Sequence, residues 1–232
     1  MASQKPNIQE SLRLYFSAGT ALGMDARLIF DTSALIDLEQ DAQRRYGFKR
    51  SHTFLDTLQQ VTGASFILPR EVREELEIHY KHHLVSGRPE ISSHTFSKIE
   101  RMPTADEELE TYLASQQEEV DNVQYFTRLL QQRYCNGKKA TLDPISPADW
   151  SVIDTALLWG MFAKNTYTKN LATASTTPFQ GVPRVAVLSS DYHIYWTLER
   201  AFEESECVEL GSHLKPFNVR LYDLVGGDQC MR

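Results

Sequence analysis

A short apolar run, residues 28–30, ends directly on a carboxylate and two hydroxyls, those of Asp31, Thr32 and Ser33. Apolar side chains then recur at helical spacing over residues 34–38. This order predicts a buried strand whose carboxyl end delivers Asp31 to the start of a helix. Because open α/β sheets bind ligands at the carboxyl ends of their parallel strands, we expect Asp31 to lie where chemistry takes place.

A second strand of the same character is predicted over residues 185–188, and it ends on Ser189, Ser190 and Asp191. Here too a strand delivers a carboxylate with hydroxyls beside it. Asp31 and Asp191 are therefore expected at one edge of a shared parallel sheet.

The rest of the pattern alternates helices with strands, which is typical of an α/β fold. Helices are predicted over residues 7–22, 54–62 and 69–83, and a strand over 64–68. Residues 164–183 are rich in Thr and Ser and are predicted to form a loop. The residues after Asp191 are predicted to form a helix followed by one or two edge strands.

Glu75 is predicted to point from its helix toward the sheet. It follows Val72 by three residues and adjoins Leu76, so it projects from the inward side, whereas Glu74 lies at roughly 200° from Val72. The alternative for this Glu-rich segment is an ordinary solvated helix.

Asp149 stands at a predicted helix start, with Ser146 as the N-cap and Pro147 at the first helical position. An aspartate there stabilises the helix N-terminus through its charge. It also lies about 20° from Ala156 on the inward face, whereas Asp154 lies about 160° away, outside the site. Asp149 is thus a helix-capping charge or a ligand of the site.

Four carboxylates at one edge of a sheet repel one another, and they are tolerated only if cations offset them or some are protonated. Oxygen ligands without His or Cys select Mg²⁺ or Mn²⁺ rather than zinc. Such sites hydrolyse phosphodiester bonds: one metal generates hydroxide and a second stabilises the leaving oxygen. The hydroxyls of Thr32 and Ser33, with the amides of the following helix, could hold a phosphate oxygen. The lack of a GxxxxGK[ST] loop argues against an NTPase.

Composition limits the class of protein further. The net charge of −7 argues against binding nucleic acid through bulk positive charge, although a local basic patch can still do so. The three cysteines are far apart, which disfavours a zinc site or disulfides and favours a reducing compartment. With no signal peptide and no apolar stretch of ~18 residues, we expect a cytoplasmic protein without membrane partners.

Residues 43–50, the basic segment, interleave aromatic and basic side chains. The basic ones are Arg44, Arg45, Lys49 and Arg50. The segment is either a solvated loop or a surface that contacts substrate, since cations bind phosphates and aromatic rings stack on bases.

Residues 87–145, the insertion, interrupt the alternation of strands and helices. A short helix is predicted over 91–102, and a capping box follows at Thr104 and Glu107. An apolar stripe over 109–134 then predicts a helix of ~30 residues, ~45 Å long. Asn136 and Gly137 are expected to end this helix. We expect an inserted arm or hairpin, whose stripe either covers the core or serves self-association or substrate holding. Its far end carries a second basic patch, made of Arg128, Arg133, Lys138 and Lys139.

Taken together, the acidic segments resemble the four acidic motifs of PIN-domain nucleases, in the order of that family. They are Asp31 to Asp37, Leu68-Pro69 leading to Glu75-Leu76, Ser146 to Asp149 with Val152-Ile153, and Leu188 to Tyr192. The resemblance covers residues 27–83 and 146–225. It implies a three-layer α/β/α fold with a central parallel sheet, and RNA cleavage that depends on Mg²⁺ or Mn²⁺.

The resemblance also implies roles for individual residues. The family's metal ligands correspond to Asp31, Glu75, Asp149 and Asp191, and its assisting hydroxyl to Ser33 or Ser189. Ser190 stands where the fourth motif often has a second acidic residue, which weakens the case for a second metal. Residues 1–26 are then an N-terminal helix, and residues 27–232 a PIN-like domain that the insertion interrupts.

In layout, the helical insertion is similar to that of minimal protein-only RNase P enzymes of the HARP type, which implies a homo-oligomer acting on tRNA or its precursor. The leading interpretation is a metal-dependent endoribonuclease, of the processing or the toxin type. Two alternatives stay open: a non-catalytic RNA-binding or assembly module on the same fold, and a flap-type DNA nuclease.

Overall fold

A four-stranded parallel sheet forms the centre of the computed structural model, which describes residues 5–17, 26–86, 90–104, 113–114, 117–137, 145–173, 184–203 and 208–223. The strand order is β2-β1-β3-β4. The strands are β1 Ala26–Phe30, β2 Ser65–Ile67, β3 Arg184–Ser189 and β4 Leu214–Asn218. Every pairing is parallel, so the carboxyl ends of all four strands lie at one edge.

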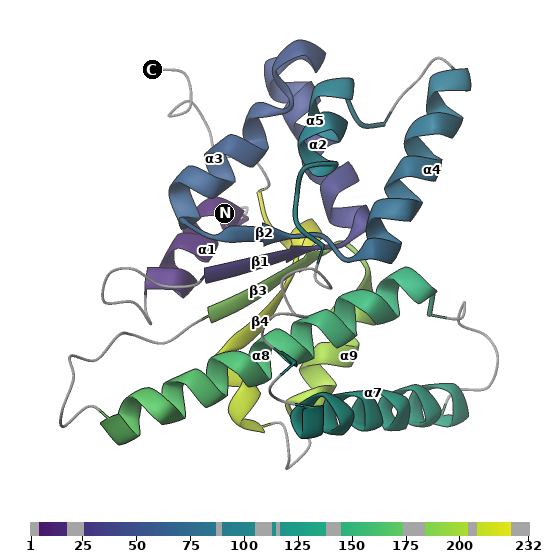
Figure 1. Cartoon of the computed structure of the whole chain (residues 1–232). Helices are drawn as coiled ribbons and strands as arrows, with labels where there is room; N and C mark the ends of the chain where they lie inside the picture. The colour runs from purple at the N-terminus through teal and green to yellow at the C-terminus, as the bar shows by residue number, and fades with distance from the viewer. Residues whose placement is uncertain are drawn as a thin grey trace.

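Helices cover both faces of this sheet (Figure 1). The helices α1 Ile8–Ser17, α2 Thr32–Tyr46 and α3 Thr53–Thr62 lie on one side, and α8 Pro147–Thr173 and α9 Tyr192–Ala201 lie on the other. The helix α4 Arg70–Ser86 packs against both α2 and α8. The predicted α/β class with a three-layer arrangement is confirmed.

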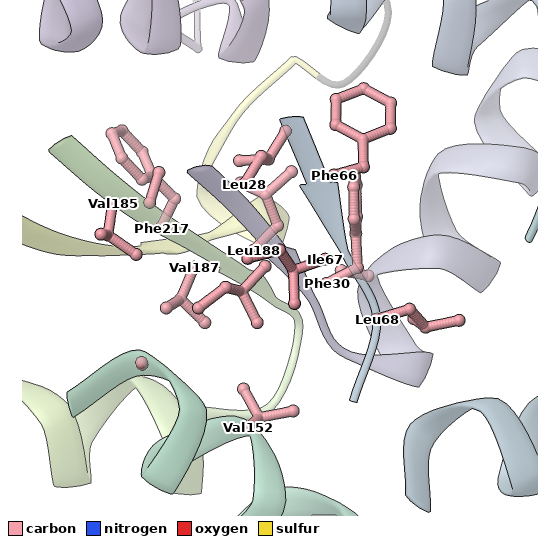
Figure 2. Close-up of a cluster of buried hydrophobic side chains, with 14 of the residues drawn as sticks. Leu28, Phe30, Phe66, Ile67, Leu68, Val152, Val185, Val187, Leu188 and Phe217 are labelled. Atoms are coloured by element: carbon pink, nitrogen blue, oxygen red, sulfur yellow. The ribbon is translucent and has the colours of Figure 1, made fainter. Parts of the chain in front are cut away.

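The alternation of side chains along the strands explains the two apolar layers. In Figure 2, Val187 points toward Val152 of α8, whereas Leu28 and Phe66 point to the opposite side of the sheet. All but Phe66 are completely buried, as expected for parallel strands that are covered on both faces. The register pairs Phe30 with Leu188 and thereby sets the following residues side by side.

The helix ends follow local chemistry where strong signals exist. Gly63 has φ of +64°, in the left-handed region, and its N–H donates to the Gln59 carbonyl, which ends α3 as predicted. The predicted helix over 69–83 is α4. The predicted N-terminal helix is present as Ile8–Ser17, and the rest of its predicted range lies outside the described residues.

The prediction of a loop from Lys164 onward is wrong, because α8 continues to Thr173. Poor helix formers cost no more than about 0.7 kcal/mol each. Packing offsets this cost, since Ala163 is buried and the Tyr167 ring lies 5.3 Å from the His213 ring.

The helix and the edge strand expected after Asp191 are present as α9 and β4. In the part of residues 202–224 that the structure describes, two short 3-10 turns, Val208–Ser212 and Val219–Leu221, flank β4. No helix of the described residues is long and apolar enough to cross a bilayer.

Two helices of the insertion are described, α5 Ser93–Ile99 and α7 Gln117–Gly137. The latter ends at Gly137 as predicted but begins at Gln117, and so it is shorter than expected. It packs along α8 (Figure 1), with Val123 and Leu130 buried, so its apolar stripe covers the core. Glu107 of the predicted capping box lies outside the described residues, as do the side chains of Arg133, Lys138 and Lys139.

A buried carboxylate attaches the insertion to α2. Glu39 is completely buried, and its oxygens accept hydrogen bonds from the Ser51 hydroxyl (2.5 Å), the Thr95 hydroxyl (2.6 Å), the Ser92 N–H (3.1 Å) and the Gln43 amide (3.1 Å). Every one of these partners donates. The charge of Glu39 is therefore stabilised by hydrogen bonds rather than by a cation.

We expect Glu39→Gln to lower the free energy of unfolding by about 1–3 kcal/mol, because the new amide group faces donors and leaves a buried polar group unsatisfied. Urea unfolding followed by circular dichroism measures this loss. Glu100→Gln, at an exposed site after α5, is the matched control. A loss no larger than that of the control would contradict the role of Glu39.

Candidate active site

Asp31 lies at the carboxyl end of β1, and its backbone N–H donates to the Leu188 carbonyl across the sheet (3.0 Å). Its side chain is 3% exposed and makes no capping bond to α2, although Asp31 occupies the N-cap position. Instead, the carboxylate accepts hydrogen bonds from the hydroxyls of Ser33 and Ser189, the latter at 2.9 Å. Helix capping therefore does not account for this carboxylate.

The surroundings of Asp31 make its ionisation costly. Burial, which is the largest cause, and the nearby carboxylates of Asp149 and Glu75 together raise the pKa of Asp31 to about 6. The hydroxyls of Ser33 and Ser189 act in the opposite direction and lower this pKa.

Glu75 reaches this edge from α4. Its Oε2 accepts a hydrogen bond of 2.5 Å from the hydroxyl of Thr32, the first residue of α2. Glu74, the residue before it on α4, is exposed. The helical period thus identified the glutamate that turns inward.

Asp149 fits both interpretations that the sequence left open. Its N–H donates to the Ser146 hydroxyl (3.1 Å) and its carboxylate accepts from the Ser146 N–H (3.0 Å), a reciprocal capping arrangement at the start of α8. Burial raises its pKa, the Ser146 hydrogen bonds lower it, and the carboxylates of Asp191 and Glu75 raise it. Asp149 therefore both caps α8 and faces the other acids.

Asp191 follows β3 and caps α9 by accepting a hydrogen bond from the His193 N–H (2.6 Å). Its own N–H donates to Ser189 at 2.8 Å. The His193 ring nitrogen Nδ1 lies 3.3 Å from the carboxylate, whose side chain is 32% exposed.

Asp31, Glu75 and Asp149 thus lie within electrostatic reach of one another, and Asp191 lies within reach of Asp149; we call the four carboxylates the carboxylate site. No Lys or Arg pairs with any of the four among the described residues. Within the same part of the chain, no three His, Cys, Asp or Glu side chains are placed so as to hold a metal ion as they stand. Their donor atoms are all oxygen, which fits a hard divalent cation such as Mg²⁺ or Mn²⁺.

Asp37 is a fifth carboxylate beside this site, and the sequence analysis did not select it. It accepts a hydrogen bond from the Ser190 hydroxyl, and the Ser190 N–H donates to Ser33 at 3.0 Å. Asp37 follows Ser33 by four residues and so shares its helix face, a signal that could have identified it. Ser190 stands where the family often has a second acidic residue, and its hydroxyl here contacts the carboxylate of Asp37 from α2 instead.

The predicted substrate-binding residues fall into two groups. Thr32, Ser33 and Ser189 lie at the carboxylate site. The basic segment lies at the other end of α2, with Arg44 ~20 Å from Asp31 along the helix axis.

The basic segment is not a loop, because it consists of the end of α2 and the 3-10 turn Phe48–Arg50. Arg45 pairs with Asp41 at 3.0 Å and with Asp223, and Arg44 lies 3.7 Å from Asp41. Lys49 and Arg50 are exposed on the turn. The structure does not bring these four cations to the carboxylates.

No family model matches the chain, and no curated protein or solved structure matches it either. The functional argument therefore rests on the order of the acidic segments and on the geometry described above.

The raised pKa of Asp31 predicts how stability depends on pH when divalent cations are absent. The folded state binds the proton of Asp31 more tightly than the unfolded state, whose aspartates titrate near 3.9. The stability that Asp31 contributes is then fully present below pH ~4 and is lost as the pH rises through ~6. We expect Asp31→Asn to match the wild type near pH ~4 and to be more stable above pH ~7, by at most about 3 kcal/mol.

Urea unfolding across this pH range in EDTA tests the expectation. Asp121→Asn, an exposed change on α7, should show no such pH-dependent difference. A constant difference between Asp31→Asn and the wild type across the range would show that Asp31 is charged throughout.

Proposed function

We propose that the protein is a metal-dependent nuclease of the PIN-domain type that hydrolyses RNA phosphodiester bonds. The observation that carries the proposal is the buried carboxylate of Asp31, which lies at the carboxyl edge of a parallel sheet beside Glu75 and Asp149 and pairs with no Lys or Arg of the described residues.

The electrostatics support this assignment. Clustered carboxylates without cationic side chains destabilise the fold, and fixed structural roles rarely need such an arrangement. A divalent cation bound by these oxygens would offset the repulsion. It would supply an activated water and polarise the phosphate.

The chain's own residues then have separate roles. Asp31, Glu75, Asp149 and Asp191 are the proposed metal ligands, and Asp31 is oriented by the hydroxyls of Ser33 and Ser189. Thr32 holds Glu75 through its hydroxyl. The hydroxyls and the first amides of α2 are the proposed contacts for a phosphate oxygen.

RNA is the substrate that the resemblance to PIN-domain nucleases suggests, with tRNA and its precursors as the first molecules to test. A matched DNA strand in the same assay separates this assignment from a DNA nuclease. Measuring the native mass of the active species tests the expected homo-oligomer.

We expect Asp31→Asn and Glu75→Gln to reduce RNA cleavage in Mn²⁺ or Mg²⁺ by at least about 100-fold, because each removes a charge that would hold the metal. EDTA should abolish cleavage by the wild type. Glu74→Gln, the exposed neighbour on the same helix, is the matched control and should retain full activity. Gel analysis of a labelled RNA measures these rates, and undiminished cleavage by Asp31→Asn would overturn the proposal.

Metal binding can be measured separately from catalysis. We expect calorimetric titration with Mn²⁺ to show a site in the wild type that is lost in Asp149→Ala. Since the same change removes the α8 cap, Asp149→Asn and thermal melting serve as controls for folding. A protein that binds RNA, shows no Mn²⁺ site and does not cleave would instead be the non-catalytic binding module.

A further inference from the structure

A cleft of about 480 Å³ opens beside the carboxylate site. It is lined by residues that include Lys5, Asp37, Arg44, Arg220 and Tyr222. The predicted site residues contribute only Arg44 to this list. The cleft therefore brings together side chains from the start of the chain, from α2 and from the turn after β4.

Hydrogen bonds connect this cleft to the catalytic edge. Asp37 in its wall accepts from the Ser190 hydroxyl, and Ser190 donates its N–H to Ser33, whose hydroxyl donates to Asp31. Asp37 lies six residues after Asp31, or about 9 Å along α2. A chain bound at the carboxylate site could therefore continue into the cleft.

The acidic side chains of the cleft are already paired. Arg45 pairs with both Asp41 and Asp223, so its positive charge partly offsets the negative charges of these two aspartates. Asp37 faces Arg220, whose Nε lies 3.7 Å from the carboxylate.

Two of the arginines that make such pairs nonetheless expose most of their side chains to solvent. The side chain of Arg44 is 72% exposed and that of Arg220 is 60% exposed. Lys5 is exposed too, and its ammonium donates to the Arg220 carbonyl at 3.1 Å. The guanidinium group offers several N–H donors in a planar fork that suits phosphate oxygens.

One aromatic side chain lines the cleft. Tyr222 is half-buried, and its ring packs 5.8 Å from the ring of Phe217, so the ring is held in place at the cleft wall.

We propose that this cleft binds the single-stranded part of an RNA substrate, with Arg220 and Arg44 contacting phosphates and Tyr222 stacking on a base. The inference rests on the proposed function, because it extends the same substrate beyond the bond that is cut. Exposed cations interleaved with aromatic rings are the features by which proteins hold single strands without reading their sequence.

Binding is measured by fluorescence anisotropy of a labelled oligouridine, with Asp31→Asn as the parent protein and EDTA present. We expect Tyr222→Ala to weaken binding at least about fivefold, and Tyr222→Phe, which keeps the ring, to preserve it. Arg220→Gln should weaken binding and reduce the slope of log affinity against log salt by about 0.7, as expected when one phosphate contact of a single strand is lost. Arg101→Gln, an exposed arginine after α5, should leave both quantities unchanged.

Unchanged affinity and salt slope in Arg220→Gln would overturn the inference, as would an equally strong affinity for duplex RNA. Because Arg220 is exposed, its variant decides the matter even if thermal melting shows that Tyr222→Ala does not fold. The two proposals fail separately. Retained cleavage by Asp31→Asn would contradict the nuclease site, whereas normal binding by Arg220→Gln would contradict only the cleft.

Discussion

The burial of one carboxylate, that of Asp31, constrains the rest of the site. The hydroxyls of Ser33 and Ser189 bind it, and neither hydroxyl adds a compensating charge. This arrangement requires α2 to begin immediately after β1. It also requires β3 to lie beside β1 in the register that pairs Phe30 with Leu188, so that Ser189 reaches Asp31. The carboxylate site therefore depends directly on how the sheet is assembled.

Neutral hydroxyl groups recur throughout this structure where charges are buried. Thr32 holds Glu75, Ser190 holds Asp37, and hydroxyls also surround Glu39. Hydroxyl donors stabilise a carboxylate without cancelling its charge. Around Asp31 the carboxylates of Asp149 and Glu75 add further negative charge, and the resulting repulsion favours the binding of a cation. Around Glu39 there is no second carboxylate among its hydrogen-bond partners, and the network attaches the insertion to α2.

The helix α7 and the cleft contact different parts of the fold, because α7 packs on α8 whereas the cleft borders α2 and the turn after β4. The apolar stripe of α7 is thus used within the chain. The exposed cations of the cleft, Arg44 and Arg220, come from segments far apart in the sequence. An acidic protein can in this way present a local cationic surface despite its net charge of −7.

The sequence by itself determined the strands, most helix starts and the inward direction of Glu75. The signals for these features are the spacing of apolar side chains, the capping residues and Gly63, and each of them acts over a few neighbouring residues. It also indicated that Asp31 and Asp191 lie at one edge, since both follow buried strands. Only the tertiary structure decided that α8 continues to Thr173, that Ser190 bonds to Asp37, and that Arg45 pairs with Asp223. These outcomes depend on packing and strand register between distant segments, which no local pattern encodes.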